Sequence, residues 1–172
     1  ASLVMTYRAL KIPQLEKQAQ TDSKTGLLNM RRFNELFSQE LQRAQRFNRP
    51  LALIMADLDL LRNINNTYGH MAGDSVLADL GHLIQSNIRE FDIAARFGGE
   101  EFCVISLETQ NDEAIIFAER LRKLVESHEF KVAVSAAPIR VTMSFGTACY
   151  PEHGTNVEQL TQLADLAMYQ AK

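Results

Sequence analysis

The feature of this sequence that most constrains its fold is a Gly-Gly pair between two short β-prone runs, residues 93–97 and 101–105. Glycine tolerates the positive φ angles of tight hairpin turns, so Gly98 and Gly99 predict a β-hairpin. The missing side chains also let a bulky ligand approach the backbone. Two adjacent carboxylates, Glu100 and Glu101, follow the glycines. Taken alone, the segment is equally typical of an ordinary hairpin.

A second acidic cluster ends a continuous apolar run, residues 51–56, which is typical of a strand buried on both faces. Side chains alternate along a strand, so Asp57 and Asp59 are expected to project to the same side. Carboxylates at the end of a buried strand repel one another and lose hydration unless a cation joins them. Magnesium prefers carboxylate and backbone oxygens. If the hairpin lies beside this strand, Asp57 and Glu100 form a divalent-metal site.

The composition limits the kinds of protein to which this chain can belong. The 172 residues suffice for one domain with an arm, and a hydrophobic content of 46% supplies a substantial core. A formal net charge of −3 gives no electrostatic case for nucleic acid as a partner. Cys103 and Cys149 lie far apart in apolar runs, so we expect reduced core residues of a cytoplasmic protein. No apolar run approaches the roughly 18 residues of a membrane span, and no signal peptide is visible.

Apolar periodicity and capping residues predict the other elements. A helix over residues 30–47 follows Asn29 as its N-cap, and Asp74 with Ser75 opens another long helix. We also expect a short helix over residues 60–68, a helix from Asn111, a strand over residues 139–150, and a capping box at residues 155–158 with its helix. The order β-α-α-β-β-α-β-α predicts an α+β layer fold, with helices packed on a mostly antiparallel sheet.

Residues 1–20 form an arm that precedes a domain over residues 21–172. Its helical spacing is interrupted by Pro13, which suits the first turn of a new helix. Two interpretations stay open: a disordered or packed arm, or the end of a helix from an upstream sensory region. The chain starts without methionine and ends inside a helical pattern, so we expect a fragment with a truncated C-terminus.

Four segments together resemble the motifs of the GGDEF-domain diguanylate cyclases. Residues 98–102 resemble the signature itself, in its GGEEF form. Residues 22–33 resemble the entry motif D-x-L-T-G-L-x-N-R-R-x-F, residues 57–74 resemble D-x-D-x-F-K-x-x-N-D-x-x-G-H-x-x-G-D, and residues 164–172 resemble the closing A-D-x-A-L-Y-x-A-K. The resemblance covers about residues 22–172 and implies the ferredoxin-like palm of the nucleotidyl cyclases.

The resemblance also implies a reaction in which a homodimer joins two GTP molecules into cyclic di-GMP and releases two pyrophosphates. Metals position the phosphate, activate the attacking hydroxyl and neutralise the leaving group in such chemistry. The family pattern places two Mg²⁺ (or Mn²⁺) ions per active site, held by the side chains of Asp57 and Glu100 and by the carbonyl of Leu58. Glu100 is the candidate proton acceptor and Glu101 assists electrostatically. For Asp59 we prefer the role of a structural cap.

The family pattern assigns recognition of guanine to Asn65 and Asp74. An ionised aspartate only accepts hydrogen bonds, which complements the two donors on the Watson–Crick edge of guanine, and Asn65 offers a donor and an acceptor. His70 matches a family position near the base. Taken alone, Asn65 is equally explained as a helix-end residue, Asp74 as an N-cap and His70 as a turn-stabilising residue.

The phosphates of GTP are expected to bind at the backbone amides of Leu61 and Arg62, in a turn, and at Lys172, which matches the family's phosphate lysine. The chain departs from the family pattern at several positions. Arg62 replaces lysine, which keeps the charge but changes the geometry, and Leu61 replaces phenylalanine. Asn66 replaces aspartate and Met30 replaces the first arginine of the entry motif.

A second ligand site is implied by Arg89 and Asp92, which match the R-x-x-D motif at which cyclic di-GMP inhibits members of the family, with Arg120 as the second arginine. Arginine can grip phosphate and lie against a guanine face, and aspartate can accept from the guanine edge. The alternative is that Arg89 merely ends a helix and Asp92 merely leads a strand, both solvated.

Two other functions stay open for the whole chain: a catalytically silent module that senses GTP or cyclic di-GMP, and a plain structural domain. Any membrane association would come from a region outside this chain.

Overall fold

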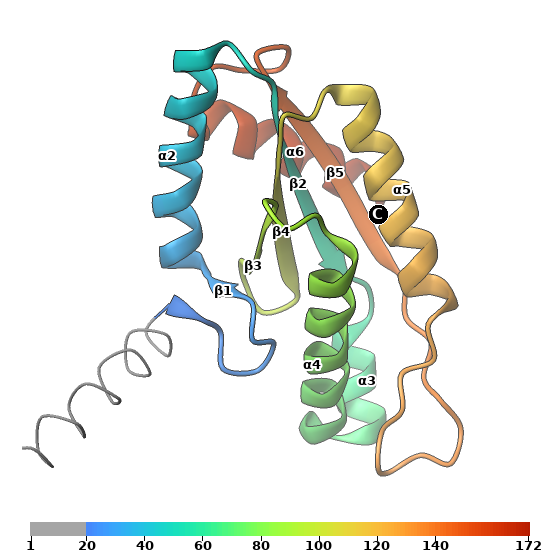
Figure 1. Ribbon diagram of the computed structural model, residues 1–172. Helices are drawn as coiled ribbons and strands as arrows, with labels where there is room; N and C mark the ends of the chain where they lie inside the picture. Colours follow the sequence, from blue (N-terminus) through green and yellow to red (C-terminus); the bar gives the residue numbers. More distant parts are fainter. Residues whose placement is uncertain (1–19) are drawn as a thin grey trace, which may run out of the picture.

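The computed structural model of the chain describes residues 20–172. Our expectations for the N-terminal arm therefore fall almost entirely outside the described residues. In this described part of the chain, five strands form one sheet in the order β1-β3-β4-β2-β5 (Figure 1). The strands are β1 (Leu28–Asn29), β2 (Leu51–Leu58), β3 (Ile93–Arg96), β4 (Glu101–Leu107) and β5 (Met143–Tyr150). Only β1 and β3 pair in parallel, so the predicted α+β fold with a mostly antiparallel sheet is confirmed.

Within residues 20–172, five helices pack around this sheet. They are α2 (Met30–Phe47), α3 (Leu61–Tyr68), α4 (His70–Asn87), α5 (Asn111–Ser127) and α6 (Val157–Ala171). The alternating residues of β2 divide between two cores, which explains why all eight are buried. Ala52, Ile54 and Ala56 pack with α4 and α5, whereas Leu53 and Met55 pack with α2 and α6. No helix within residues 20–172 has both the length and the apolar character needed to cross a bilayer.

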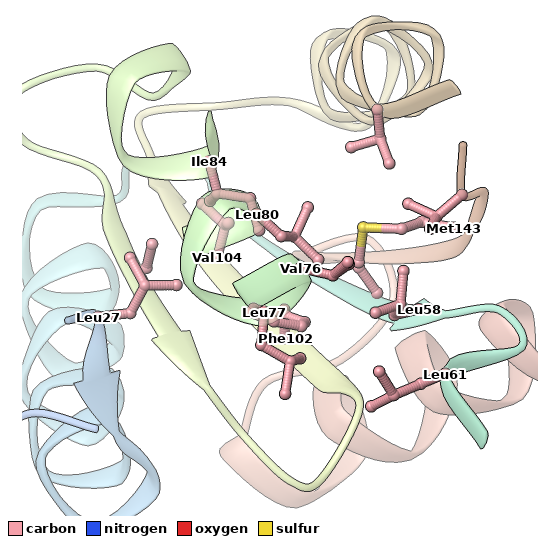
Figure 2. Close-up of a cluster of buried hydrophobic side chains, with 14 of the residues drawn as sticks. Leu27, Leu58, Leu61, Val76, Leu77, Leu80, Ile84, Phe102, Val104 and Met143 are labelled. Atoms are coloured by element: carbon pink, nitrogen blue, oxygen red, sulfur yellow. The ribbon is translucent and has the colours of Figure 1, made fainter. Parts of the chain in front are cut away.

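The core beneath α4 fixes the helix that carries the predicted base-binding aspartate. Figure 2 shows Val76, Leu77 and Leu80 of α4 pointing into a cluster with Phe102 of β4 and Leu58 of β2. All five side chains are at most 3% exposed. Burying a side chain of this size stabilises a fold by about 1.5–3 kcal/mol. The start of α4 is therefore held against the ends of β2 and β4.

The Gly-Gly hairpin is confirmed, but not the predicted backbone conformation of its turn. Phe97 N and Gly98 N both donate to Glu101 O, at 2.8 and 3.2 Å, and β3 pairs antiparallel with β4. Among the described glycines, positive φ occurs at Gly26 and Gly69, and not at Gly98 or Gly99. At Gly98 an added Cβ would lie 2.4 Å from Glu101 Oε2, so the Glu101 carboxylate occupies the space beside this glycine.

Several predicted boundaries were wrong. Helix α4 begins at His70, four residues before the predicted Asp74. Gly69 has a φ of +87°, which ends α3, and its carbonyl accepts from Ala72 N and Gly73 N in the first turn of α4. Asp74 is therefore no N-cap. Strand β5 begins at Met143, since Ile139 instead forms an isolated bridge with Phe130.

One cap differs from the prediction, and one strand was missed. The N-cap of α6 is Asn156, one residue beyond Thr155: Asn156 accepts from Gln159 N, while Gln159 Oε1 accepts from Thr155 N. Helix α5 begins at Asn111, as predicted, and Gln110 is its N-cap. The two-residue strand β1 was not expected.

Both cysteines are buried and free, as their apolar surroundings predicted. Burial raises the pKa of the Cys149 thiol to about 11, and it raises that of Cys103 well above its ordinary value. Thiols are unreactive in such surroundings.

Candidate functional site

The hairpin lies beside the buried strand, which is the condition for the predicted acidic site. Asp57 of β2 stands directly opposite Glu101 of β4, and Leu58 N donates to Glu100 O at 2.9 Å. Asp59 lies just past the end of β2, and its carboxylate accepts from the hydroxyls of Thr142 and Ser144 at 2.8 and 3.1 Å. Asp59 N also donates to Thr142 O at 2.9 Å, and Ser144 is the cross-strand partner of Asp57, so these contacts agree with the predicted placement of Asp57 and Asp59 on the same side. The contacts of Asp59 also support the structural role that we preferred.

Asp57 presents a buried oxygen that lacks a hydrogen-bond partner. The residue is 5% exposed, and its Oδ1 is the one buried side-chain oxygen or nitrogen in residues 20–172 without such a partner. Lys172 Nζ lies 2.8 Å from Oδ1, and this distance makes the two groups an ion pair. The angles of the contact do not meet the criteria for a hydrogen bond. The contact with Asp57 raises the pKa of Lys172, against the effect of its partial burial. Oδ1 therefore keeps lone pairs for another cation.

The second glutamate of the turn is held among like charges. Burial is the main factor that raises the pKa of Glu101, and repulsion from Asp57, Asp165 and Glu100 adds to it, while Lys172 opposes it. The carboxylate folds back against Gly98, where an added Cβ would lie 2.4 Å from its Oε2. A bound cation would relieve this repulsion, because an opposite charge favours the ionised form.

The side chains present fit a divalent cation that shares its ligands with a nucleotide. Within residues 20–172, no group of three or more His, Cys, Asp or Glu side chains is arranged to hold a metal by itself. Magnesium does not need such a cage, since it is usually held by one or two carboxylates with phosphates and waters as its other ligands. Asp57, with its unpartnered buried oxygen, and Glu100 beside it provide that donor set.

A cavity of about 460 Å³ opens beside these carboxylates. Its lining brings together most of the predicted catalytic and base-binding residues from β2, α3, α4 and the hairpin turn: Asp57, Leu61, Asn65, His70, Asp74, Gly99, Glu100 and Glu101, together with Lys24, Leu77 and Arg96. Arg62 and Lys172 are not among the lining residues, and Arg62 is exposed.

Asn65 and Asp74 are adjacent in space because Gly73 has no side chain. A Cβ at Gly73 would lie 1.9 Å from Asn65 Oδ1, so the amide rests directly on the backbone of α4 one residue before Asp74. The predicted phosphate-binding amides lie at the start of α3. There Leu60 adopts a left-handed conformation (φ 62°), and Leu61 and Arg62 are the first two residues of the helix. First-turn amides have no intrahelical acceptor and can bind anions.

Two cationic residues of the cavity were not predicted as site residues. Lys24 Nζ lies 2.5 Å from Asp74 Oδ1, with both side chains 46% exposed. Lys24 stands where the quoted entry motif has leucine, and this departure was the available signal. Arg96 joins two turns: its guanidinium donates to Gly98 O and Gly99 O at 3.0 and 2.6 Å, and to both carboxylate oxygens of Asp22 at 3.3 Å.

The Asp22 carboxylate organises the turn over residues 22–26 at the start of the entry motif, which we call the entry turn. It accepts from Thr25 N at 2.9 Å and from Thr25 Oγ1 at 2.8 Å. Burial alone would raise the pKa of Asp22, but the hydrogen bonds from Thr25 and the nearby Arg96 outweigh it and lower the pKa. The entry turn and the Gly-Gly turn are thus locked together through one arginine.

The three residues of the predicted inhibitory site also lie together, away from this cavity. Arg89 and Arg120 line a pocket of about 300 Å³, and Arg120 lies over the ring of Phe117 and donates to Asn87 O at 2.8 Å. Arg89 and Asp92 also line a cavity of about 520 Å³ at the other end of β2.

Asp92 differs from the solvated alternative, because it is 8% exposed. One carboxylate oxygen accepts from Arg89 N at 3.1 Å, and the other accepts from Ser106 Oγ at 3.1 Å and Leu107 N at 3.3 Å. Its carboxylate therefore fixes the turn that carries Arg89.

Comparison with known families matches residues 19–172 to the model described as diguanylate cyclase, GGDEF domain. The chain therefore belongs to the GGDEF domain family. It is 37% identical over 158 residues to cyclic di-GMP phosphodiesterase NbdA of Pseudomonas aeruginosa, covering 92% of this chain and 20% of that protein. It is 37% identical over 154 residues to response regulator PleD of Caulobacter vibrioides, with coverages of 90% and 34%. It is 36% identical over 151 residues to diguanylate cyclase DosC of Escherichia coli, with coverages of 88% and 32%.

Solved structures agree with this assignment. The GGDEF domain of Pseudomonas aeruginosa TpbB, also called YfiN, aligns with a TM-score of 0.83 at 32% identity and covers 88% of each chain. The coiled coil and GGDEF domain of DgcB from Caulobacter crescentus, solved in complex with c-di-GMP, aligns with a TM-score of 0.87 at 25% identity and covers 98% of this chain and 88% of that one. This chain spans about a third or less of the length of the three curated relatives.

Proposed function

We propose that the chain is the catalytic domain of a diguanylate cyclase, which joins two GTP molecules into cyclic di-GMP and releases two pyrophosphates. One observation carries the proposal: the intact acidic turn lies beside the buried carboxylate of Asp57, whose Oδ1 has no hydrogen-bond partner, at the mouth of a cavity that also contains Asn65 and Asp74. The GGEEF form supplies the same carboxylate as the family signature, one methylene further from the backbone.

We assign to the residues the roles that the family pattern implies. Magnesium bound here would neutralise the charge that develops on the α-phosphate and on the leaving pyrophosphate. Asp57, Glu100 and the carbonyl of Leu58 would hold the ion, and Glu100 would accept the proton of the attacking 3′-hydroxyl. Glu101 contributes negative charge beside them. The amides of Leu61 and Arg62 and the ammonium of Lys172 bind phosphate oxygens, and Asp74 accepts from the guanine edge while Asn65 and His70 complete the base subsite.

Catalysis requires two copies of the domain. The cavity of about 460 Å³ beside Asp57 is suited to one nucleotide, whereas cyclisation needs two reciprocal attacks. We therefore propose a homodimer in which two such cavities face each other. The second site, formed by Arg89, Asp92 and Arg120, binds the product and inhibits the enzyme without competing with GTP.

A second candidate is a silent module that binds cyclic di-GMP without making it. Two observations favour it: the pocket that Arg89 and Arg120 share, and the contact of Lys172 with the carboxylate that the metal needs. The names of the relatives do not decide between the two functions, since they include a cyclic di-GMP phosphodiesterase and a diguanylate cyclase.

The deciding experiment incubates the protein with GTP and Mg²⁺ and measures cyclic di-GMP by chromatography. We expect product from the unsubstituted protein and none from Glu100→Ala, which removes a metal ligand without removing a core contact. Glu152→Ala is the matched control, because Glu152 is an exposed glutamate far from β2 in the sequence. This variant should keep full activity. Normal turnover in Glu100→Ala would refute the assignment, and absence of product from the unsubstituted protein would favour the silent module.

A further inference from the structure

Lys24 brings an unexpected positive charge to the wall of the proposed base subsite. Its ammonium lies 2.5 Å from Asp74 Oδ1, and both residues line the same cavity as Asn65. The quoted entry motif has leucine at this position, and a leucine offers no hydrogen-bonding group. The contact is therefore a consequence of this chain's own departure from the family pattern.

The fold holds the backbone of Lys24 firmly, although the side chain is half exposed. Gly81 of α4 packs directly on the entry turn, since a Cβ at Gly81 would lie 2.5 Å from Thr25 O. Asp22 accepts two hydrogen bonds from Thr25, and Arg96 fixes Asp22 from the other side. Lys24 thus extends from a rigid turn along α4 toward Asp74.

Lys24 keeps more unused donors than the other cation of this cavity. Arg96 is the other lysine or arginine among the lining residues, and its Nε, Nη1 and Nη2 already donate to Gly98 O, to the Asp22 carboxylate and to Gly99 O. A lysine ammonium has three donors, and the hydrogen bond to Asp74 uses one of them. An exposed ion pair of this kind is worth little by itself, so the pair does not block the subsite.

The paired charges complement guanine and mismatch adenine. Guanine carries the acceptor O6 next to the donors at N1 and on the 2-amino group, and the cavity places a donor-only ammonium next to an acceptor-only carboxylate. Adenine carries an amino donor at position 6 and no proton at N1. It would therefore meet the ammonium with a donor and the carboxylate with an acceptor, and unpaired polar groups of this kind are heavily penalised.

We propose that Lys24 is a specificity-determining residue, which donates a hydrogen bond to O6 of the guanine base while Asp74 accepts from the N1 and 2-amino donors. The inference rests on the proposed function, because it assumes that GTP occupies this cavity. It adds to that function a contact that the family pattern does not supply.

The test compares guanine analogues that differ at one edge position. Binding of GDP, 6-thio-GDP and IDP is measured by calorimetry with Mg²⁺, because these diphosphates have no pyrophosphate to lose. Sulfur accepts hydrogen bonds weakly, so the unsubstituted protein should bind GDP about five- to tenfold more tightly than 6-thio-GDP, as expected for one partly exposed charged hydrogen bond. Lys24→Met should abolish this preference, and Lys24→Arg should retain it. The penalty for IDP, which lacks the 2-amino group, should be the same in all variants.

Lys131→Met, at an exposed lysine outside the cavity, is the control and should keep both preferences. The inference is overturned if the unsubstituted protein does not distinguish GDP from 6-thio-GDP, or if Lys24→Met keeps the preference. It is also overturned if Lys24→Met weakens all three ligands equally, which would indicate a phosphate contact, or if it tightens GDP binding, which would indicate competition with the base. If the unsubstituted protein neither binds GDP nor forms cyclic di-GMP, the proposed function fails and the inference falls with it.

Discussion

Replacing Gly73 by alanine separates base recognition from folding. The new Cβ would lie 1.9 Å from Asn65 Oδ1 and 3.0 Å from its Cγ, so the amide must turn away from α4. This movement costs little, because the obstructing atoms are the end of a flexible side chain. Alanine also favours a helix over glycine by about 0.5–1 kcal/mol. We therefore expect the free energy of unfolding to change by no more than about 1 kcal/mol.

Nucleotide binding should suffer where folding does not. Each hydrogen bond between the Asn65 amide and guanine contributes about 0.5–1.5 kcal/mol, so losing one raises the dissociation constant about three- to tenfold. Calorimetric titration with GDP measures the affinity, and thermal denaturation measures the stability of the same samples. Unchanged affinity in a folded Gly73→Ala variant would refute the placement of Asn65 against the base.

Gly81→Ala in the same helix is the matched control, with the opposite expectation. Its Cβ would lie 2.5 Å from the backbone oxygen of Thr25, which cannot rotate away. Overpacking of this kind costs about 1–3 kcal/mol, and each kcal/mol lowers the melting temperature of a domain of this size by about 2–4 °C. A Gly81→Ala variant as stable as the unsubstituted protein would contradict the close packing of the entry turn on α4.

Three further changes test other parts of the site. Arg96→Lys keeps the charge but loses the fork that joins Asp22 to Gly98 and Gly99, so we expect a loss of about 1–3 kcal/mol in urea unfolding and slower product formation; equal stability would contradict this role. Glu101→Gln should stabilise the protein near neutral pH: burial and repulsion raise the pKa of Glu101, so its ionised form opposes folding above its unfolded-state pKa. The advantage should vanish as the pH falls below the ordinary range of glutamate, and a pH-independent difference in melting temperature would show another cause. Arg89→Ala should weaken inhibition by cyclic di-GMP at every GTP concentration, whereas inhibition as tight as in the unsubstituted protein would reject the second site.

The acidic site was predictable because local patterns determine its parts. A strand whose residues are all apolar is stable only when both of its faces are buried, and the eight residues of β2 are all buried. The same burial places Asp57 at the end of a central strand, where the hairpin supplies Glu101 as its cross-strand partner. The burial of β2 and its pairing with the hairpin were therefore the parts of the site that local sequence patterns could predict.

The errors arose where distant contacts or a single backbone angle decided the outcome. Asp74 resembled an N-cap, but the left-handed angle of Gly69 starts α4 four residues earlier and turns Asp74 into a helix-face residue. Lys24 reaches Asp74 across 50 positions, and the path depends on how Gly81 packs on the entry turn. Periodicity and capping rules describe neighbours within about one helical turn, so neither contact leaves a local signal.

The two lysines of the site contact carboxylates of very different burial, and this difference separates their roles in the proposed reaction. The side chain of Asp57 is 7% exposed and that of Asp74 is 46% exposed. A buried carboxylate is costly without a cation, so the positive charge of Lys172 beside Asp57 can leave only when another cation replaces it. A divalent ion that arrives with the nucleotide provides the larger charge, and Lys172 is then available for the phosphates, as the family pattern implies. Asp74 needs no such exchange, because solvent already stabilises it. The proposed guanine contact of Lys24 therefore requires no displacement of a buried charge.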